Sequence, residues 1–144
     1  MEELFELKAY IEQGRYAEAL QLIEEMEEMS KDDKINKIYS LAVVLLLHLI
    51  KKHAERRTTR SWEYSIWNAS RQIQRVNKRR KSGGFYLSEQ ETREVITEAY
   101  ADALRRAALE ACEGQYTEPQ LEAMIDREQL NQEALAMVMS PAES

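Results

Sequence analysis

The amino-acid sequence predicts an all-α protein, a single-domain bundle of about six or seven helices around a buried central helix at about residues 32–54. Glycine and proline are scarce, four and two among 144 residues, whereas good helix formers are abundant. The run Leu41–Ile50 would present apolar groups on nearly every side of a helix, which indicates burial on all sides. This run is about half the roughly 20 residues that a bilayer-spanning helix needs, so we expect no membrane segment.

A hairpin of two helices is predicted for residues 1–30. The first helix is expected over Glu2–Gln13, with Gly14 ending it. The second begins at Tyr16 and is expected to turn four residues inward: Ala19, Leu20, Ile23 and Met26. Its exposed side would then carry four glutamates: Glu24, Glu25, Glu27 and Glu28.

The central helix and a basic helix are expected within residues 32–82. Ser30, Asp32 and Asp33 are candidate N-caps for the central helix, and Thr58 or Thr59 for the basic one. The basic helix is predicted to end near Ser82, because the pair Gly83-Gly84 that follows is the strongest helix breaker in the sequence.

The C-terminal helices are predicted within residues 88–139. Ser88 and Glu91 have capping-box spacing, so a helix should start at Glu89. Its inner face would be formed largely of small residues: Val95, Ile96, Ala99, Ala103, Leu104, Ala107, Ala108 and Ala111.

Two further helices are expected near the end of the chain. Thr117 and Gln120 repeat the capping-box spacing around Pro119 and predict a short helix. A last helix is expected over about Arg127–Met139.

The basic helix has two faces of different chemistry. With Trp62 at zero on a helical wheel, four other apolar residues fall within about 40° of it: Ile66, Ala69, Ile73 and Val76. We expect this face, including Trp62, to be buried against the central helix. The opposite direction gathers arginines and aromatics, which we call the ridge: Arg60, Tyr64, Trp67, Arg71, Arg75 and Lys78.

Charge is strongly segregated along the chain. Residues 51–81 contain eleven Lys and Arg against two Glu, a net charge of +9, so the remaining residues must carry −15 to reach the total of −6. Such a basic block can mark nucleic-acid binding. It can equally be neutralised by the acidic helices of the same protein, or meet an acidic protein partner.

The ridge is the best candidate binding surface that the sequence offers. Arg and Trp carry much of the binding energy at protein interfaces, and Arg also grips phosphates. Three explanations remain open for Trp67: it packs against another helix of the bundle, it contacts a protein partner or a second copy of this chain, or it contacts nucleic acid.

Residues for catalysis or metal binding do not form a recognisable pattern. His48 and His53 lie about 140° apart on a helix and cannot share a metal as an i, i+4 pair does. We expect His48 in or near the core with a hydrogen-bond partner, and His53 on the surface. Cys112 has no nearby cation to lower its pKa. The sequence contains neither a Glu-x-x-His pair nor a P-loop, so we expect no catalytic, cofactor or metal site.

Cysteine usage bears on the compartment. Cys112 is the single cysteine, so no disulfide can form within the chain. Neither a signal peptide nor a membrane anchor is recognisable, and a cytoplasmic location is expected.

The chain resembles a bacterial family of small helical proteins catalogued as domain of unknown function twenty-nine. The spacing from His48 through Trp62 is the most specific part of the resemblance. The residues that carry it are Leu22, Ile23, Glu24, Glu25, Met26, Glu27, Glu28, Leu46, His48, Leu49, Lys51, Arg57, Arg60, Ser61, Trp62, Ile66, Arg71, Ala99, Tyr100 and Ala103. The resemblance implies a compact helical domain and supplies no catalytic residues.

These observations favour a non-enzymatic protein-interaction domain that binds another protein or a second copy of itself. The alternative is a small nucleic-acid-binding protein that uses the basic helix at residues 51–81. A third interpretation, ranked last because no paired acid-base motif is present, is an enzyme whose site is assembled from residues that the sequence does not link.

Overall fold

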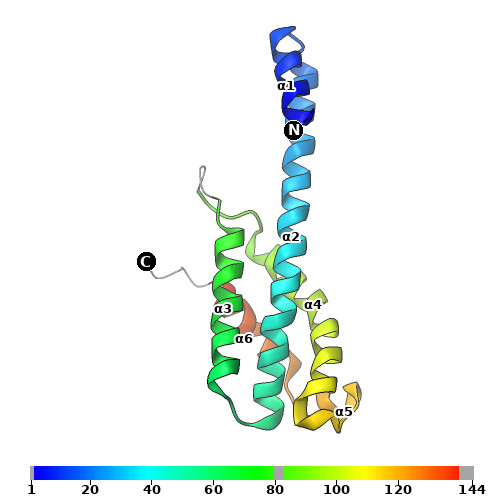
Figure 1. Ribbon diagram of the computed structural model, residues 1–144, viewed down its shortest axis with the longest axis vertical. Coiled ribbons are helices and arrows are strands. Elements are labelled where there is room, and N and C mark those ends of the chain that lie inside the picture. Colours follow the sequence, from blue (N-terminus) through cyan, green and yellow to red (C-terminus); the bar gives the residue numbers. More distant parts are fainter. Residues whose placement is uncertain (1, 80–82, 140–144) are drawn as a thin grey trace. The chain divides into compact units, whose positions relative to one another are not determined.

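The computed structural model describes residues 2–79 and 83–139, and within these ranges the chain forms helices and no strand (Figure 1). The helices are α1 (Glu2–Glu12), α2 (Tyr16–Glu55), α3 (Arg60–Asn77), α4 (Glu89–Glu110), α5 (Glu118–Glu122) and α6 (Arg127–Met139), with the 3-10 turn η1 (Ala111–Gly114) after α4. The predicted all-α class is confirmed. Within the described ranges, no helix is long and apolar enough to cross a bilayer. The chain divides into two compact units, unit 1 (Met1–Lys34) and unit 2 (Ile35–Ser144).

Helix α2 runs without a break from Tyr16 to Glu55, which shows that the predicted start of a separate helix near residue 32 was wrong. Ser30, Asp32 and Asp33 lie inside α2 and cap nothing. Each of these residues costs roughly 0.5 kcal/mol in a helix relative to Ala. Ending one helix and starting another would leave about four carbonyls and four amides unpaired and require a second nucleation step. Continuing the helix is therefore the less costly outcome.

Unit 1 is a hairpin in which α1 is joined to the first part of α2 by a turn at Gly14 (φ +74°). The amide of Arg15 donates to the carbonyl of Tyr10 at 2.8 Å, and the Arg15 guanidinium lies 4.7 Å from the centre of the Tyr10 ring. These contacts stabilise the turn that the sequence predicted.

The hairpin buries less apolar surface than the sequence predicted. Among its described side chains, Ala19 and Leu22 are buried and Met26 is half-buried. Leu20 is 62% exposed and Ile23 is also exposed, so the prediction that both face inward was wrong. A single neighbouring helix covers a narrow stripe of α2, and these two side chains fall outside it. The four glutamates predicted on the exposed side are exposed.

The core of unit 2 is built around the part of α2 that the sequence marked as apolar. Ile38, Leu45, Leu46, Leu49 and Ile50 are all completely buried there. They belong to one cluster with buried residues of α3, α4, α5 and α6. In the view of Figure 1, α3 and α4 flank this half of α2. The predicted central helix is therefore confirmed for this stretch.

Helix α3 begins as predicted and ends earlier than predicted. The Thr59 hydroxyl accepts a hydrogen bond from the Trp62 amide at 3.0 Å and caps the helix. The helix ends at Asn77 instead of near Ser82, which itself lies outside the described residues. The Asn77 carbonyl accepts the Tyr86 amide at 2.8 Å, and its side-chain oxygen accepts the Leu87 amide at 2.8 Å. These bonds to the returning chain replace the next helical turn.

The C-terminal helices follow the sequence closely. Both predicted capping boxes are present, Ser88 with Glu91 at the start of α4 and Thr117 with Gln120 at the start of α5. The predicted inner face of α4 is buried except for the half-buried Ala108. Helix α6 has the predicted bounds.

A left-handed turn separates α4 from α5. Cys112, Glu113 and Gly114 have φ angles of +50°, +57° and +72°. The first two are uncommon conformations for residues with a Cβ. A Cβ at position 114 would lie 3.1 Å from the Leu109 carbonyl oxygen, so this position specifically requires glycine.

Candidate functional site

Five of the six ridge residues lie on the exposed side of α3, opposite the residues that this helix buries. Lys78 does not share this helical face as predicted, because the helix ends at Asn77 and Lys78 follows it with an extended backbone. Ile66, Ala69 and Ile73 are buried and Val76 is half-buried against the core, as the helical wheel predicted. Tyr64 is 61% exposed and Trp67 is 53% exposed, and the four ridge cations are exposed as well. Of the explanations left open for Trp67, packing against another helix of unit 2 does not apply.

Aromatic and cationic groups stack along the centre of the ridge. The rings of Tyr64 and Trp67 have centroids 5.9 Å apart and are tilted by 41°. The Arg71 guanidinium lies 5.3 Å from the centre of the Trp67 ring, as their i, i+4 spacing predicted. The indole is thus held between a phenol and a guanidinium and presents a preformed, amphipathic surface to the solvent.

The basic block of residues 51–81 separates into two parts with different electrostatic surroundings. At the end of α2, Lys51 pairs with Glu110, Lys52 with Glu63, and His53 with Glu133, at distances of 3.2, 2.8 and 2.9 Å. Arg57 just beyond α2 pairs with Glu55 at 3.0 Å. Lys51, Lys52 and Arg57 are thus paired within the molecule, which was one of the alternatives that the sequence left open, whereas the exposed Arg56 forms no ion pair among the described residues. Arg80 and Lys81 lie outside the described residues.

The second part of the block contains the ridge, which is not neutralised in this way, and Arg79, whose guanidinium lies 5.6 Å from the centre of the Tyr86 ring. Within residues 2–79 and 83–139, none of the four ridge cations, Arg60, Arg71, Arg75 and Lys78, forms an ion pair. Their positive field is therefore available to a partner. An exposed indole beside unpaired arginines is the combination of groups that dominates binding at protein interfaces.

Trp62 is held differently from what the sequence predicted. It is half-buried and lies outside the core cluster, so its assignment to the core was wrong. Its ring lies between two cations, with Lys51 Nζ at 4.8 Å and Arg57 Cζ at 4.6 Å from its centre. Lys51 is itself buried, and its ammonium group also contacts Glu110. Trp62 is near the first turn of α3, where the helix meets the charged end of α2 instead of its apolar middle.

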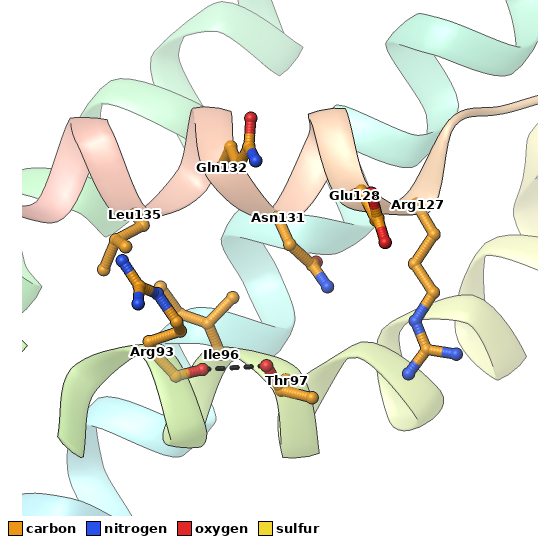
Figure 2. Close-up of a pocket in the computed structure, with 8 residues that line it drawn as sticks. All are labelled: Arg93, Ile96, Thr97, Arg127, Glu128, Asn131, Gln132 and Leu135. Carbon is orange, nitrogen blue, oxygen red and sulfur yellow. Dashed lines mark hydrogen bonds between the residues drawn. The ribbon is translucent and has the colours of Figure 1, made fainter. Parts of the chain in front are cut away.

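A groove of about 650 Å³ runs between α4 and α6 (Figure 2). Arg93 and Arg127 lie toward its opposite ends, and the Asn131 amide points between the two helices. The Thr97 hydroxyl donates a hydrogen bond to the Arg93 carbonyl at 2.9 Å within α4. Its proton is therefore already used in that bond. The lining mixes polar with apolar side chains, and among its residues Glu128 is the one carboxylate, with no second acid or base to form a catalytic pair with it.

Two buried polar atoms near this groove have no hydrogen-bond partner among the described residues, the Tyr100 hydroxyl and Asn131 Oδ1. Burial is the main cause that raises the pKa of Tyr100 to about 12, with a smaller contribution from Glu122. The Arg127 guanidinium lies 4.6 Å from the centre of the Tyr100 ring and opposes that rise. The phenol therefore stays protonated at neutral pH and cannot act as a base there.

The two histidines and the cysteine do not form a reactive site. His48 is half-buried, and its Nδ1 lies 2.8 Å from the Val44 carbonyl oxygen, which confirms a near-core histidine with a partner. His53 is not a simple surface residue, because it is half-buried against Glu133 of α6. Burial, and then Glu55, raise the pKa of the Cys112 thiol, so the thiolate is disfavoured. Within residues 2–79 and 83–139, no cluster of His, Cys, Asp and Glu is arranged to hold a metal ion.

The groove and the side-chain contacts at the end of α2 were not predicted from the sequence. Lys51 and Glu110 are 59 residues apart in the sequence, and His53 and Glu133 are 80 residues apart. No local spacing links such distant residues. The ridge was found because five of its six members, all except Lys78, share one helix, so that spacing alone places them on one face.

Comparison with known proteins identifies the family and no more than that. No significant match was found among curated proteins, and none was found among solved structures. The profile of the family described as Domain of unknown function DUF29 matches residues 9–135, which include α3 with its ridge and the groove between α4 and α6. The chain belongs to the DUF29 family.

Proposed function

We propose that this chain is a non-enzymatic protein-interaction domain that binds its partner through the ridge on α3. The observation that supports this proposal best is Trp67, which is 53% exposed and held between Tyr64 and Arg71. A tryptophan in contact with solvent adds nothing to the core, and its stacked neighbours reduce the entropy that it loses on binding.

The partner that fits this surface is a protein with an apolar patch bordered by carboxylates. The indole and phenol of the ridge would bury apolar area, and the guanidinium groups would make charge-assisted hydrogen bonds with Asp or Glu. None of the four ridge cations forms an ion pair among the described residues, so no internal ion pair has to break first. The partner could be another protein or a second copy of this chain.

The proposal includes a location in the bacterial cytoplasm. A single cysteine whose pKa is raised by burial suits a reducing compartment, where it would stay a thiol. The bacterial origin rests on the resemblance that the sequence shows to its family.

Nucleic acid is the alternative partner, and the unpaired ridge cations are the observation that favours it. Three exposed cations of α3, and Lys78 just after it, could each contact a phosphate, and Tyr64 or Trp67 could stack on an unpaired base. The chain as a whole carries a charge of −6, which repels a polyanion. We therefore rank this alternative second.

Site-specific crosslinking separates the two partners. Replacing Tyr64 by the photoreactive p-benzoylphenylalanine, in the full chain expressed in its native cells, should give one discrete protein adduct on irradiation. Trp67→Ala in the same chain should strongly reduce that adduct. The matched control carries the photoreactive group at Tyr116, which is also exposed but belongs to the segment after α4. An adduct with nucleic acid would put the alternative first, and the absence of any adduct specific to position 64 would refute a binding role for the ridge.

A further inference from the structure

We propose that the partner of the ridge is the unit 1 hairpin of a second copy of this chain. This inference rests on the proposed function, because it names the occupant of the same ridge. Two surfaces of opposite charge, each with exposed apolar groups, carry the argument, one on each unit.

The first surface belongs to unit 1. Among the described side chains of this hairpin, six large hydrophobic ones are exposed: Leu4, Phe5, Ile11, Tyr16, Leu20 and Ile23. Phe5 is 72% exposed, and α1 buries none of its residues. Two helices with so little buried apolar area between them gain little stability from each other, and exposed apolar patches of this kind are typical of interfaces.

Part of this surface is a continuous stripe along α2. Tyr16, Leu20 and Ile23 are four and three residues apart, which places them within about 60° of one another around the helix. Glu27 follows at the next turn of the same stripe. An apolar stripe ending in a carboxylate is the complement of a ridge that carries aromatic rings and arginines.

The charges of the two surfaces also match. Residues 1–34 contain eleven Asp and Glu against four Lys and Arg, a net charge of −7. The ridge supplies four cations that form no ion pair with any residue the structure describes. Two hairpins meeting each other would bring like charges together, and two ridges would do the same, whereas a hairpin on a ridge joins opposite charges.

A second copy is the occupant that these complementary surfaces single out. Every chain brings one hairpin and one ridge, so each contact between two copies satisfies a surface of each kind. Heterologous contacts of this type close into a ring or dimer or continue into a longer assembly. In both cases the ridge is the receiving surface and the hairpin is the occupant.

The test is a complementation experiment on the full chain. The ridge variant carries Trp67→Ala with Arg71→Glu, and the hairpin variant carries Phe5→Gln with Leu20→Gln. Light scattering and sedimentation should show that the wild type self-associates, and that each variant alone does so on the order of tenfold to a hundredfold more weakly. Mixing the two variants should restore association, because the intact hairpin of one fits the intact ridge of the other.

Matched controls guard against misfolding and nonspecific effects. Leu109→Gln with Arg106→Glu changes an equally exposed apolar residue and an exposed arginine on α4, and it should leave self-association unchanged. Circular dichroism should show the same helix content in all four proteins. Higher salt should weaken wild-type association, since exposed charges are screened.

Each other outcome overturns the inference in a distinguishable way. If the ridge variant still associates while the hairpin variant does not, the hairpins pair with each other. If the mixture fails to associate although both variants are folded, the two surfaces do not meet. A wild type that stays monomeric at its highest soluble concentration rules out a second copy, whereas the crosslinking from position 64 still decides whether the ridge binds a different protein.

Discussion

The Glu55 carboxylate accepts a hydrogen bond from the backbone amide of Cys112 at 3.1 Å, across 57 residues of sequence. This bond joins the C-terminal end of α2 to the left-handed turn η1 that follows α4. The Glu55 side chain is 14% exposed, and its carboxylate also accepts a hydrogen bond from the Arg57 guanidinium. Cys112 has an unusual, left-handed backbone conformation, and its amide is thus hydrogen-bonded by a carboxylate from another helix.

Replacing Glu55 should therefore weaken the fold measurably. Glu55→Ala leaves the half-buried Cys112 amide without its acceptor, and we expect a loss of about 1 to 3 kcal/mol in the free energy of unfolding. Urea unfolding measures this loss. Glu25→Ala, at an exposed position of α2, is the control and should change stability by less than about 0.5 kcal/mol. Equal losses in the two variants would show that the bond to Cys112 contributes nothing.

The two tryptophans of α3 should respond very differently to truncation. Trp62→Ala removes a half-buried ring and two cation-π contacts, so we expect a loss of about 2 to 3 kcal/mol. Trp67→Ala removes a largely exposed ring and should cost less than about 1 kcal/mol. Thermal or urea unfolding of the two variants measures both losses in the free energy of unfolding. A larger loss for Trp67 would contradict the assignment of the two faces of α3.

Tyr100 should make the fold sensitive to alkaline pH. The unfolded side chain ionises near its ordinary pKa of 10.0, whereas burial raises the pKa in the folded protein to about 12. Between these values the unfolded state holds fewer protons, so the free energy of unfolding falls as the pH rises. The loss contributed by Tyr100 should approach about 2 to 3 kcal/mol near pH 12 and be absent below pH 9.

Tyr100→Phe isolates this effect. Tyr39, whose pKa is raised by its hydrogen bond to Asp102, titrates in both proteins and cancels from the comparison. At pH 7 the variant should be as stable as the wild type or more so, because the hydroxyl that it loses is buried without a partner among the described residues. A variant that is less stable at pH 7 and equally sensitive to alkali would contradict the environment described for this phenol.

Two glycines with the same left-handed backbone should differ in their tolerance of alanine. Gly114→Ala forces a Cβ to 3.1 Å from the Leu109 carbonyl oxygen in addition to the backbone strain. Gly14→Ala meets no atom within 4 Å and bears only the strain of a positive φ, about 1 to 2 kcal/mol. The free energy of unfolding should thus be lower for Gly114→Ala than for Gly14→Ala. The opposite order would show that the turn at η1 adjusts freely.

The number of ridge cations sets an upper limit on how steeply any binding to nucleic acid through the ridge should fall with salt. Four phosphate contacts would give a slope of about −3.6 in a plot of log affinity against log salt on duplex DNA. Anisotropy titrations with duplex DNA, single-stranded DNA and RNA measure it. Given the charge of −6, we expect at most weak binding at physiological salt. Sub-micromolar binding that is lost in an Arg71→Glu, Arg75→Glu variant would favour the nucleic-acid alternative over a protein partner.

Features encoded within one or two helical turns were predictable from the sequence, and those that depend on distant neighbours were not. The capping residues Ser88 and Thr117 act on amides three residues away, so their pattern is visible locally. The end of α3 was misplaced because the Asn77 carbonyl is taken by Tyr86, a bond that the local sequence does not reveal. Leu20 was assigned to the interior because apolar spacing shows which side of a helix is hydrophobic, and not whether enough protein exists to cover it.

The same division applies to the candidate site. The common face of the five ridge residues in α3 follows from helical geometry, but their exposure depends on which helices surround α3. The electrostatic difference between Lys51, held by Glu110, and Arg75, held by no carboxylate among the described residues, requires the folded arrangement of both.

The separation of the basic block into an internally paired part and an unpaired ridge has a consequence for natural variation. Replacing a side chain such as Lys51 removes a contact of the fold, so folding by itself would restrain its drift. Replacing Arg75 costs the folded chain almost nothing, and a mutational scan that scores cellular abundance should tolerate nearly any residue there. Any constraint that a growth-based scan or a comparison of natural variants finds at the ridge would therefore report what the cell requires of this surface, independently of what the chain requires in order to fold.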